Sequence, residues 1–177
     1  TVSFQMKNGI RLYGGFPSTG SPTFVMRNWQ NFPTILSGGN YSYQVVKGDG
    51  VSVAAGLDGF IIENGRAYGS PATLTNRGGG VAVHNGNLNI SNTVFRNNVG
   101  LVAAGLYLDG GTVRLFNTIF HNNVADVGGA AGGAIYKSQG TLVVMNSVFV
   151  NNSAVSGGAI YSSFSGTTVR NSIFWDN

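Results

Sequence analysis

The chain has 177 residues, a formal net charge of +4 and no cysteine, so disulfide scaffolds, cysteine-ligated zinc sites and thiol nucleophiles are excluded. Only 9% of its residues are charged, against roughly 25% in an ordinary soluble domain. Its basic residues stand singly rather than in runs, which argues against nucleic acid as a partner, because nucleic-acid surfaces concentrate basic charge.

Glycine and asparagine, with 28 and 20 copies, make up much of the share of the composition that charged residues usually have. Both tolerate the left-handed backbone of tight bends, so this composition favours short strands and turns over long helices. The longest apolar stretch, residues 99–108, is too short to cross a bilayer, and we expect no direct membrane span. The chain opens without a recognisable signal peptide, and we expect it to be a segment of a longer protein.

The N-terminal part, residues 1–86, is predicted to form irregular coils. Residues 34–36 and 43–46 alternate like strands, and residues 57–62 fill the same slot as the later repeats, with Ile62 where those repeats have Phe. Residues 17–33 hold three of the four prolines, and we expect an irregular excursion there.

From residue 87 to 177 a short phrase recurs, a Phe followed three residues later by Asn. The four Phe residues are separated by 25, 29 and 25 positions: Phe95, Phe120, Phe149 and Phe174. A unit of this period cannot bury its apolar face alone, so the copies must stack on one another. We therefore predict an all-β parallel β-helix forming a single domain over residues 1–177. It would have about seven coils, with three short strands in each.

In such a solenoid the repeated residues form columns inside the core. We predict an aromatic column of the four Phe side chains and a ladder of Asn side chains bonded from coil to coil. A column of small hydroxyl side chains would lie beside them, formed by Thr93, Thr118, Ser147 and Ser172.

The paired Gly-Gly-Ala-Ile sequences at 132–135 and 157–160, together with the four Phe-x-x-Asn units, resemble the repeats of the polymorphic outer membrane protein family. Residues 6–16, 34–38 and 58–62 look like the opening coils of large bacterial surface proteins with right-handed parallel β-helix repeats. The resemblance implies a right-handed solenoid that is secreted or displayed at the bacterial surface, in association with the outer membrane. It also implies an adhesive or structural role.

Carboxylates and histidines do not form a recognisable catalytic pattern. Glycosidase chemistry needs two carboxylates roughly 5–9.5 Å apart, and the acids do not fall into one column of neighbouring coils. His84 and His121 are 37 residues apart with no ligand partner at useful spacing. We expect no enzyme activity, no cofactor and no metal; the less favoured alternative is a polysaccharide lyase or hydrolase.

Seven residues are candidates for contacts outside the core. Strict alternation from each Phe points one β-branched residue of every repeat outward, which would make an apolar face for a partner chain. The simpler alternative is that a bend or a covering loop buries these four. The candidates for a partner face are Val94, Ile119, Val148 and Ile173, and those for a ligand contact are Trp29, His121 and Trp175.

The sequence thus predicts a non-enzymatic, extracellular bacterial surface or secreted protein with an adhesive or structural role. Its partners would be glycans or surface proteins of a host or neighbour. One alternative is a carbohydrate-binding or polysaccharide-degrading β-helix, contacting sugar through residues 17–33. A further alternative is a fibre subunit that associates through its coil ends.

Overall fold

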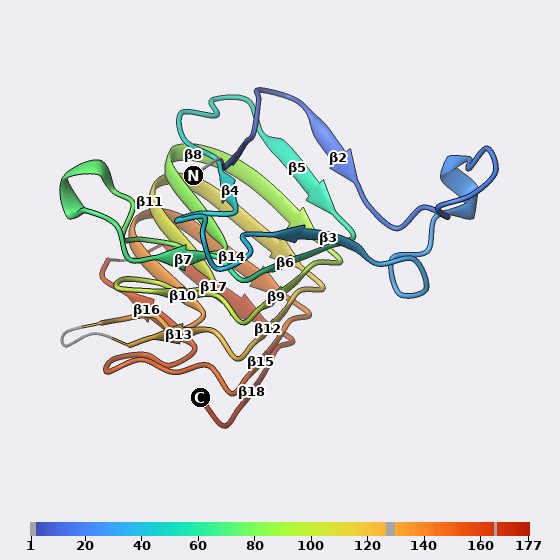
Figure 1. The fold of residues 1–177 in the computed structure, drawn as a ribbon. Coiled ribbons are helices and arrows are strands. Elements are labelled where there is room, and N and C mark those ends of the chain that lie inside the picture. The colour runs from blue at the N-terminus through green and yellow to red at the C-terminus, as the bar shows by residue number, and fades with distance from the viewer. Residues whose placement is uncertain (1–2, 127–129, 165) are drawn as a thin grey trace.

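The computed structural model describes residues 3–126, 130–164 and 166–177. The chain winds into a solenoid whose coils stack along one axis, with the two termini toward opposite ends (Figure 1). Within the described residues the only helical segments are two single 3-10 turns, η1 (Phe24–Met26) and η2 (Pro71–Thr73).

All neighbouring strands in the three sheets pair in parallel. Sheet A comprises β1 (Phe4–Gln5), β2 (Arg11–Tyr13), β4 (Val46–Lys47), β5 (Ala55–Asp58), β8 (Val81–Ser91), β11 (Leu106–Phe116), β14 (Ile135–Met145), β16 (Ile160–Ser162) and β17 (Thr167–Arg170). Sheet B comprises β3 (Thr34–Ser37), β6 (Phe60–Glu63), β9 (Val94–Arg96), β12 (Ile119–His121), β15 (Val148–Val150) and β18 (Ile173–Trp175). Sheet C comprises β7 (Arg66–Ala67), β10 (Val99–Gly100) and β13 (Val124–Ala125).

The solenoid has about five turns, so the prediction of about seven was too high. Sheet B receives one strand from each coil, and its six strands in the described residues mark five turns from β3 to β18. The difference arises in the N-terminal part. Residues 17–33 leave the solenoid as a projecting arm, as predicted, and contribute no coil (Figure 1).

The long strands of sheet A differ from the sequence-based prediction. Three short strands were expected in each coil, but β8, β11 and β14 are each a single strand of 11 residues that runs through a glycine-containing bend. The backbone stays paired across the bend, where Gly111 lies opposite Gly86. Gly111 has φ +82°, and a Cβ there would collide with the carbonyl oxygen of Gly86, so glycine is required.

Asparagines make the two bends on either side of sheet B. The residue two positions before each of β9, β12, β15 and β18 is Asn, with φ between 49° and 53°: Asn92, Asn117, Asn146 and Asn171. The residue after each of these strands is also left-handed, with φ between 51° and 55°: Asn97, Asn122, Asn151 and Asp176. Asn is the residue other than Gly that most readily adopts this conformation, which explains its abundance.

The predicted aromatic column is confirmed. Phe95, Phe120 and Phe149 are fully buried, and their rings stack at 4.2 and 5.0 Å with interplanar angles of 5°. Phe174 continues the stack at 4.7 Å from Phe149, although it is 45% exposed in the last coil. Ile62 occupies the same slot one coil earlier, as predicted, since it pairs with Phe95.

The asparagine ladder is confirmed as well, and it uses the second residue of each Asn pair. Asn98 Nδ2 donates to Asn123 Oδ1 at 3.0 Å, and Asn123 Nδ2 donates to Asn152 Oδ1 at 2.9 Å. Asn152 Nδ2 donates to Asn177 Oδ1 at 2.8 Å. Each of these amides also donates to a carbonyl of the preceding coil; for Asn123 it is that of Phe95, at 3.0 Å. Buried polar side chains are thereby satisfied in every repeat.

The hydroxyl column lies at the bend before sheet B. Thr93, Thr118 and Ser147 are buried, and the hydroxyls of Thr118 and Ser147 lie 2.9 Å apart. The backbone nitrogen of Ser147 donates to the Ser172 hydroxyl at 3.2 Å. The predicted column therefore links the coils of Thr118, Ser147 and Ser172 through its hydroxyls.

Candidate functional site

The outer face of sheet B carries the predicted apolar stripe. Val94, Ile119 and Val148 alternate outward from the buried Phe residues and are partly exposed, and Ile173 is 61% exposed. The strand register extends the stripe by two residues, because Val94 pairs with Ile61 and Ile61 with Ile35. The stripe is thus an unbroken column of six β-branched aliphatic side chains, one per coil, and the bend does not turn it into the core.

A second outward column on the same face contains two of the predicted ligand contacts. His121 pairs with Val150 and Val150 with Trp175, which is 71% exposed. Earlier in the column, Arg96 pairs with Glu63 through a 2.6 Å salt bridge. Burial and the neighbouring Arg96 charge lower the pKa of His121 below its usual 6.5. Six of the seven predicted contact residues therefore lie on one face.

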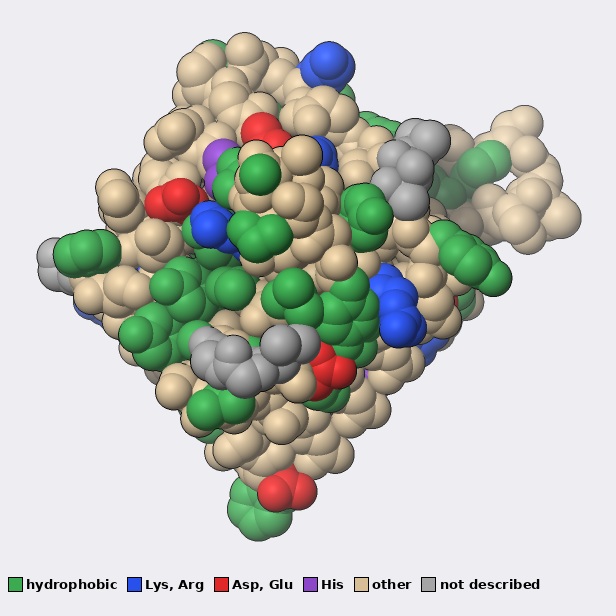
Figure 2. Space-filling model, turned by 60° about the vertical axis from the view of Figure 1, so that its left-hand side comes forward, with side chains coloured by type: hydrophobic (Ala, Val, Ile, Leu, Met, Phe, Trp, Pro, Cys, Tyr) green, Lys and Arg blue, Asp and Glu red, His purple; other side chains and the backbone are tan. Residues whose placement is uncertain are grey.

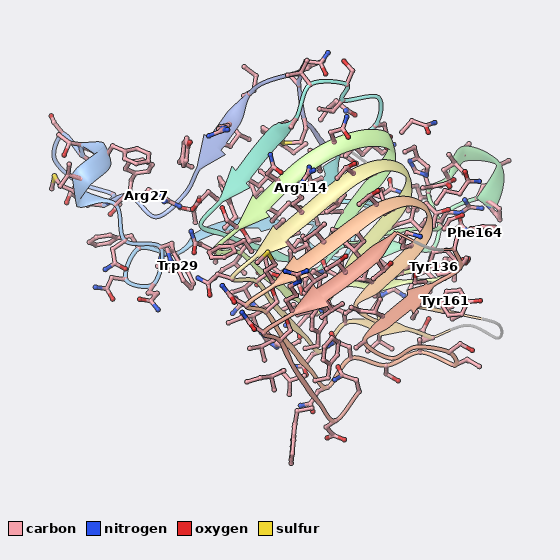
Figure 3. The ribbon with its side chains drawn as sticks, turned by 180° about the vertical axis from the view of Figure 1, so that it is seen from behind. Arg27, Trp29, Arg114, Tyr136, Tyr161 and Phe164 are labelled. Carbon is pink, nitrogen blue, oxygen red and sulfur yellow. The ribbon has the colours of Figure 1, made fainter. Side chains whose placement is uncertain are left out.

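Trp29 lies elsewhere, at the junction of the arm with the solenoid. Its backbone and Cβ sit against Gly15 and Gly59, where added side chains would collide with them. Trp29 is partly buried. The arm also places three apolar residues in exposed positions in η1. Figure 3 shows Trp29 and Arg27 close to where the arm joins the body.

Asp58 anchors this arm. Arg27 forms an ion pair with Asp58 and donates from Nε to the Gly14 carbonyl at 2.5 Å. Asp58 also accepts hydrogen bonds from Ser91 Oγ at 2.7 Å and Asn92 Nδ2 at 3.0 Å. Burial acts to raise the pKa of Asp58, but the hydrogen bonds from Ser91, Asn92 and Arg27 and the Arg27 charge outweigh it, so the pKa lies below 3.8. Asp58 was not among the residues that the sequence singled out as contact candidates.

Beside this anchor, the outer face of sheet A contains a hollow of about 270 Å³ that was not predicted. Its floor is Gly56, which lies in an outward column between Arg11 and Asn89, and Arg114 follows Asn89 in the next coil. Figure 3 shows Arg114 on the broad face of sheet A. The sequence contains a clue to this hollow. Ile62 aligns with Phe95 at an offset of 33 residues, and the same offset places Gly56, which has no side chain, in the column of Asn89.

A tyrosine ladder forms the other outward column of note on sheet A. Tyr107, Tyr136 and Tyr161 stack at 5.5 and 5.0 Å, and Arg77 Nη1 donates to the Tyr107 hydroxyl at 2.8 Å. Tyr136 and Tyr161 lie along the same edge as the exposed Phe164 (Figure 3). Tyr107 is buried, whereas Tyr136 and Tyr161 are partly exposed, so only the C-terminal part of the column reaches the surface.

Most of the carboxylates are held by neighbours in other coils. Besides Asp58 and Glu63, Asp49 lies 2.8 Å from His84 Nδ1, and Asp126 accepts from the Tyr68 hydroxyl at 2.5 Å. Across residues 3–126, 130–164 and 166–177, no group of three His, Cys, Asp or Glu side chains is placed to hold a metal ion. Charged side chains are scattered over the face seen in Figure 2.

In the part of the chain that the structure describes, neither 3-10 turn approaches the length of a helix that could span a membrane. No curated protein and no solved structure matches this sequence. A family model described as "Right handed beta helix region" matches residues 25–177, which is most of the chain and includes all six strands of sheet B. With its parallel coils and its internal ladders, the chain belongs to the right-handed β-helix family.

Proposed function

We propose that this chain is a non-catalytic adhesive module of an extracellular bacterial surface protein, and that it binds another protein through the outer face of sheet B. The observation that carries the proposal is the six-residue aliphatic stripe, which runs the length of the sheet at partly to largely exposed positions. Contiguous apolar surface of this kind is uncommon on monomers and typically marks an interaction site.

The chemistry of the stripe favours a protein as the occupant. β-branched aliphatic side chains offer dispersion and desolvation but neither hydrogen bonds nor aromatic faces, which sugar recognition requires. The charges beside it, Arg96 and Glu63, are already paired with each other. A flat apolar strip on another protein would therefore gain the most from contact with this face.

Two further features support the non-catalytic and extracellular parts of the proposal. Glu63 and Asp49 each contact a basic side chain from another coil, and Asp58 pairs with Arg27 of the arm, which suits a structural role for all three. The Gly-Gly-Ala-Ile and Phe-x-x-Asn repeats resemble those of polymorphic outer membrane proteins, which supports display at the bacterial surface.

The test compares the same substitution on two faces. Beads coated with the chain are applied to epithelial cell layers, using wild type, Val148→Asp in the stripe and Val124→Asp on sheet C. Both valines are partly exposed, so both variants should fold. We expect adhesion by Val148→Asp to fall at least tenfold and adhesion by Val124→Asp to be retained. Equal adhesion of the two variants would overturn the assigned face.

Location and assembly need separate measurements. Protease treatment of intact bacteria that produce the native protein should cleave it if it is displayed at the surface. Light scattering on the purified chain distinguishes a monomer from coil-end self-assembly, which stays an alternative prediction. A stripe that binds its own copy would give a dimer that Val148→Asp dissociates.

A further inference from the structure

The hollow on sheet A exists because one side chain is missing from an otherwise filled column. Gly56 lies between Arg11 and Asn89 in the strand register, and Arg114 follows one coil later. The neighbouring column supplies Tyr13, Asp58 and Ser91 to its wall. The hollow is therefore lined by side chains from three successive coils.

The charge around the hollow is positive. Arg11 and Arg114 are exposed, and neither forms an ion pair with a carboxylate that the structure describes. The one carboxylate in the wall, Asp58, is neutralised by Arg27 and accepts further hydrogen bonds from Ser91 and Asn92. An anionic ligand would therefore meet two arginines without an opposing free carboxylate.

The remaining lining suits a ligand that also carries hydroxyl groups. The Tyr13 ring is fixed edge-to-face against Phe24 at 5.0 Å, with the Arg27 guanidinium 5.4 Å from its centre. Asn89 supplies an amide beside it. The backbone of β5 is already paired on both sides, with β2 and β8, so an extended peptide could not bind there as an added strand.

We propose that this hollow binds an acidic polysaccharide, with Arg11 and Arg114 each holding a carboxylate or sulfate group and Tyr13 and Asn89 contacting the sugar ring between them. The two arginines are three coils apart, about 14 Å at the backbone, and so suit charges that repeat along a chain. This site lies on a different face from the stripe and recognises a different class of partner, so it stands apart from the proposed adhesive function.

Calorimetry on the whole chain tests the site with three probes: heparin, hyaluronate and neutral dextran. We expect binding of at least one acidic polymer and none of dextran. Because each arginine would donate charge-assisted hydrogen bonds to the polymer, Arg11→Gln and Arg114→Gln should each weaken binding roughly tenfold or more. Arg66→Gln is the charge-matched control, since Arg66 is exposed and lies on sheet C, away from the hollow.

A second variant fills the hollow and keeps every charge. Gly56 has a backbone outside the left-handed region, and an added Cβ would meet only the flexible Arg11 side chain, at 3.1 Å, so Gly56→Val should fold. We expect it to weaken binding at least tenfold. Unchanged binding by a folded Gly56→Val, an equal loss in Arg66→Gln, or equally tight binding of poly-glutamate would overturn the proposal. Failure of both heparin and hyaluronate to bind would also overturn the proposal.

Discussion

The core is packed differently in the two halves of the solenoid, residues 1–86 and residues 87–177. Residues 87–177 repeat one solution in every coil, with Phe95, Phe120 and Phe149 stacked beside the asparagine ladder. Earlier coils have Ile62 in the Phe slot and Gly65 in the Asn slot. A side chain at Gly65 would collide with the Gly79 carbonyl, so the ladder stops there, and the Gly65 nitrogen donates to Asn98 Oδ1 at 3.0 Å.

The two halves therefore differ in what their residues contribute: the repeated half stabilises the fold, and the irregular half forms individual contacts. The repeated half builds its core from identical slots, whereas the irregular half contains features that occur once: the arm, its Arg27–Asp58 anchor and the Gly56 hollow. We therefore expect substitutions in the ladders to affect unfolding and those in the irregular half to affect local contacts. Three predictions test this division.

The largest effect is expected from Phe120→Ala. Phe120 is fully buried between two stacked rings, and removing such a side chain typically destabilises a core by about 3–5 kcal/mol. Phe116→Ala in the same coil is the control: its side chain is 49% exposed on the outer face of sheet A, and we expect a change within about 0.5 kcal/mol. Urea unfolding followed by circular dichroism measures both. Similar losses in the two variants would contradict the assigned core.

Asn123→Ala should have the next largest effect. It leaves the Phe95 carbonyl and the Asn98 backbone nitrogen without their partner in the buried ladder. Two orphaned groups at about 1–3 kcal/mol each suggest a loss of about 3 kcal/mol. Asn122→Gly changes the adjacent bend, which has φ +55°, and should be close to neutral because glycine adopts this conformation freely. A neutral Asn123→Ala would show that the ladder does not stabilise the fold.

The smallest effect on overall stability is expected at the arm. Because the folded-state pKa of Asp58 is lowered, its contribution is present above pH 3.8 and is lost as the pH falls through the folded-state value. Trp29 fluorescence, measured in a Trp175→Phe background, should therefore change only below pH 3.8. Asp58→Asn should release Arg27 at neutral pH and accelerate tryptic cleavage there, with unfolding almost unchanged. Asp126→Asn is the control, and equal cleavage rates would exclude the anchor.

Much of the core was predictable from the sequence because its residues recur. The Phe, Asn and Thr/Ser columns follow from the spacing alone, and so does the outward direction of Val94, Ile119 and Val148. The number of coils was overestimated although the excursion of residues 17–33 was expected, because the repeat is irregular over residues 1–86 and gives no clear count of coils there. The continuity of β8, β11 and β14 was also missed, because glycine-rich bends suggest a break between strands, yet here they stay within paired strands, with shifts of register between β11 and β14.

The candidate sites were only partly predictable. The stripe residues, His121 and Trp175 came together on one face because they belong to the repeats. The contact of Arg27 with Asp58 joins residues 31 positions apart that have no equivalents in other coils, so no periodic signal could reveal it. The hollow depends on an absent side chain at Gly56, which is visible only once neighbouring coils are aligned.

The direction of the backbone hydrogen bonds has a mechanical consequence. In a stack of parallel coils these bonds run along the axis, and the two ends of the chain lie toward opposite ends of that axis (Figure 1). A force that pulls the two ends apart would break the hydrogen bonds between two coils one after another rather than all together. The module should therefore lengthen coil by coil under tension. A tether of this kind would yield gradually between two attached surfaces instead of failing all at once.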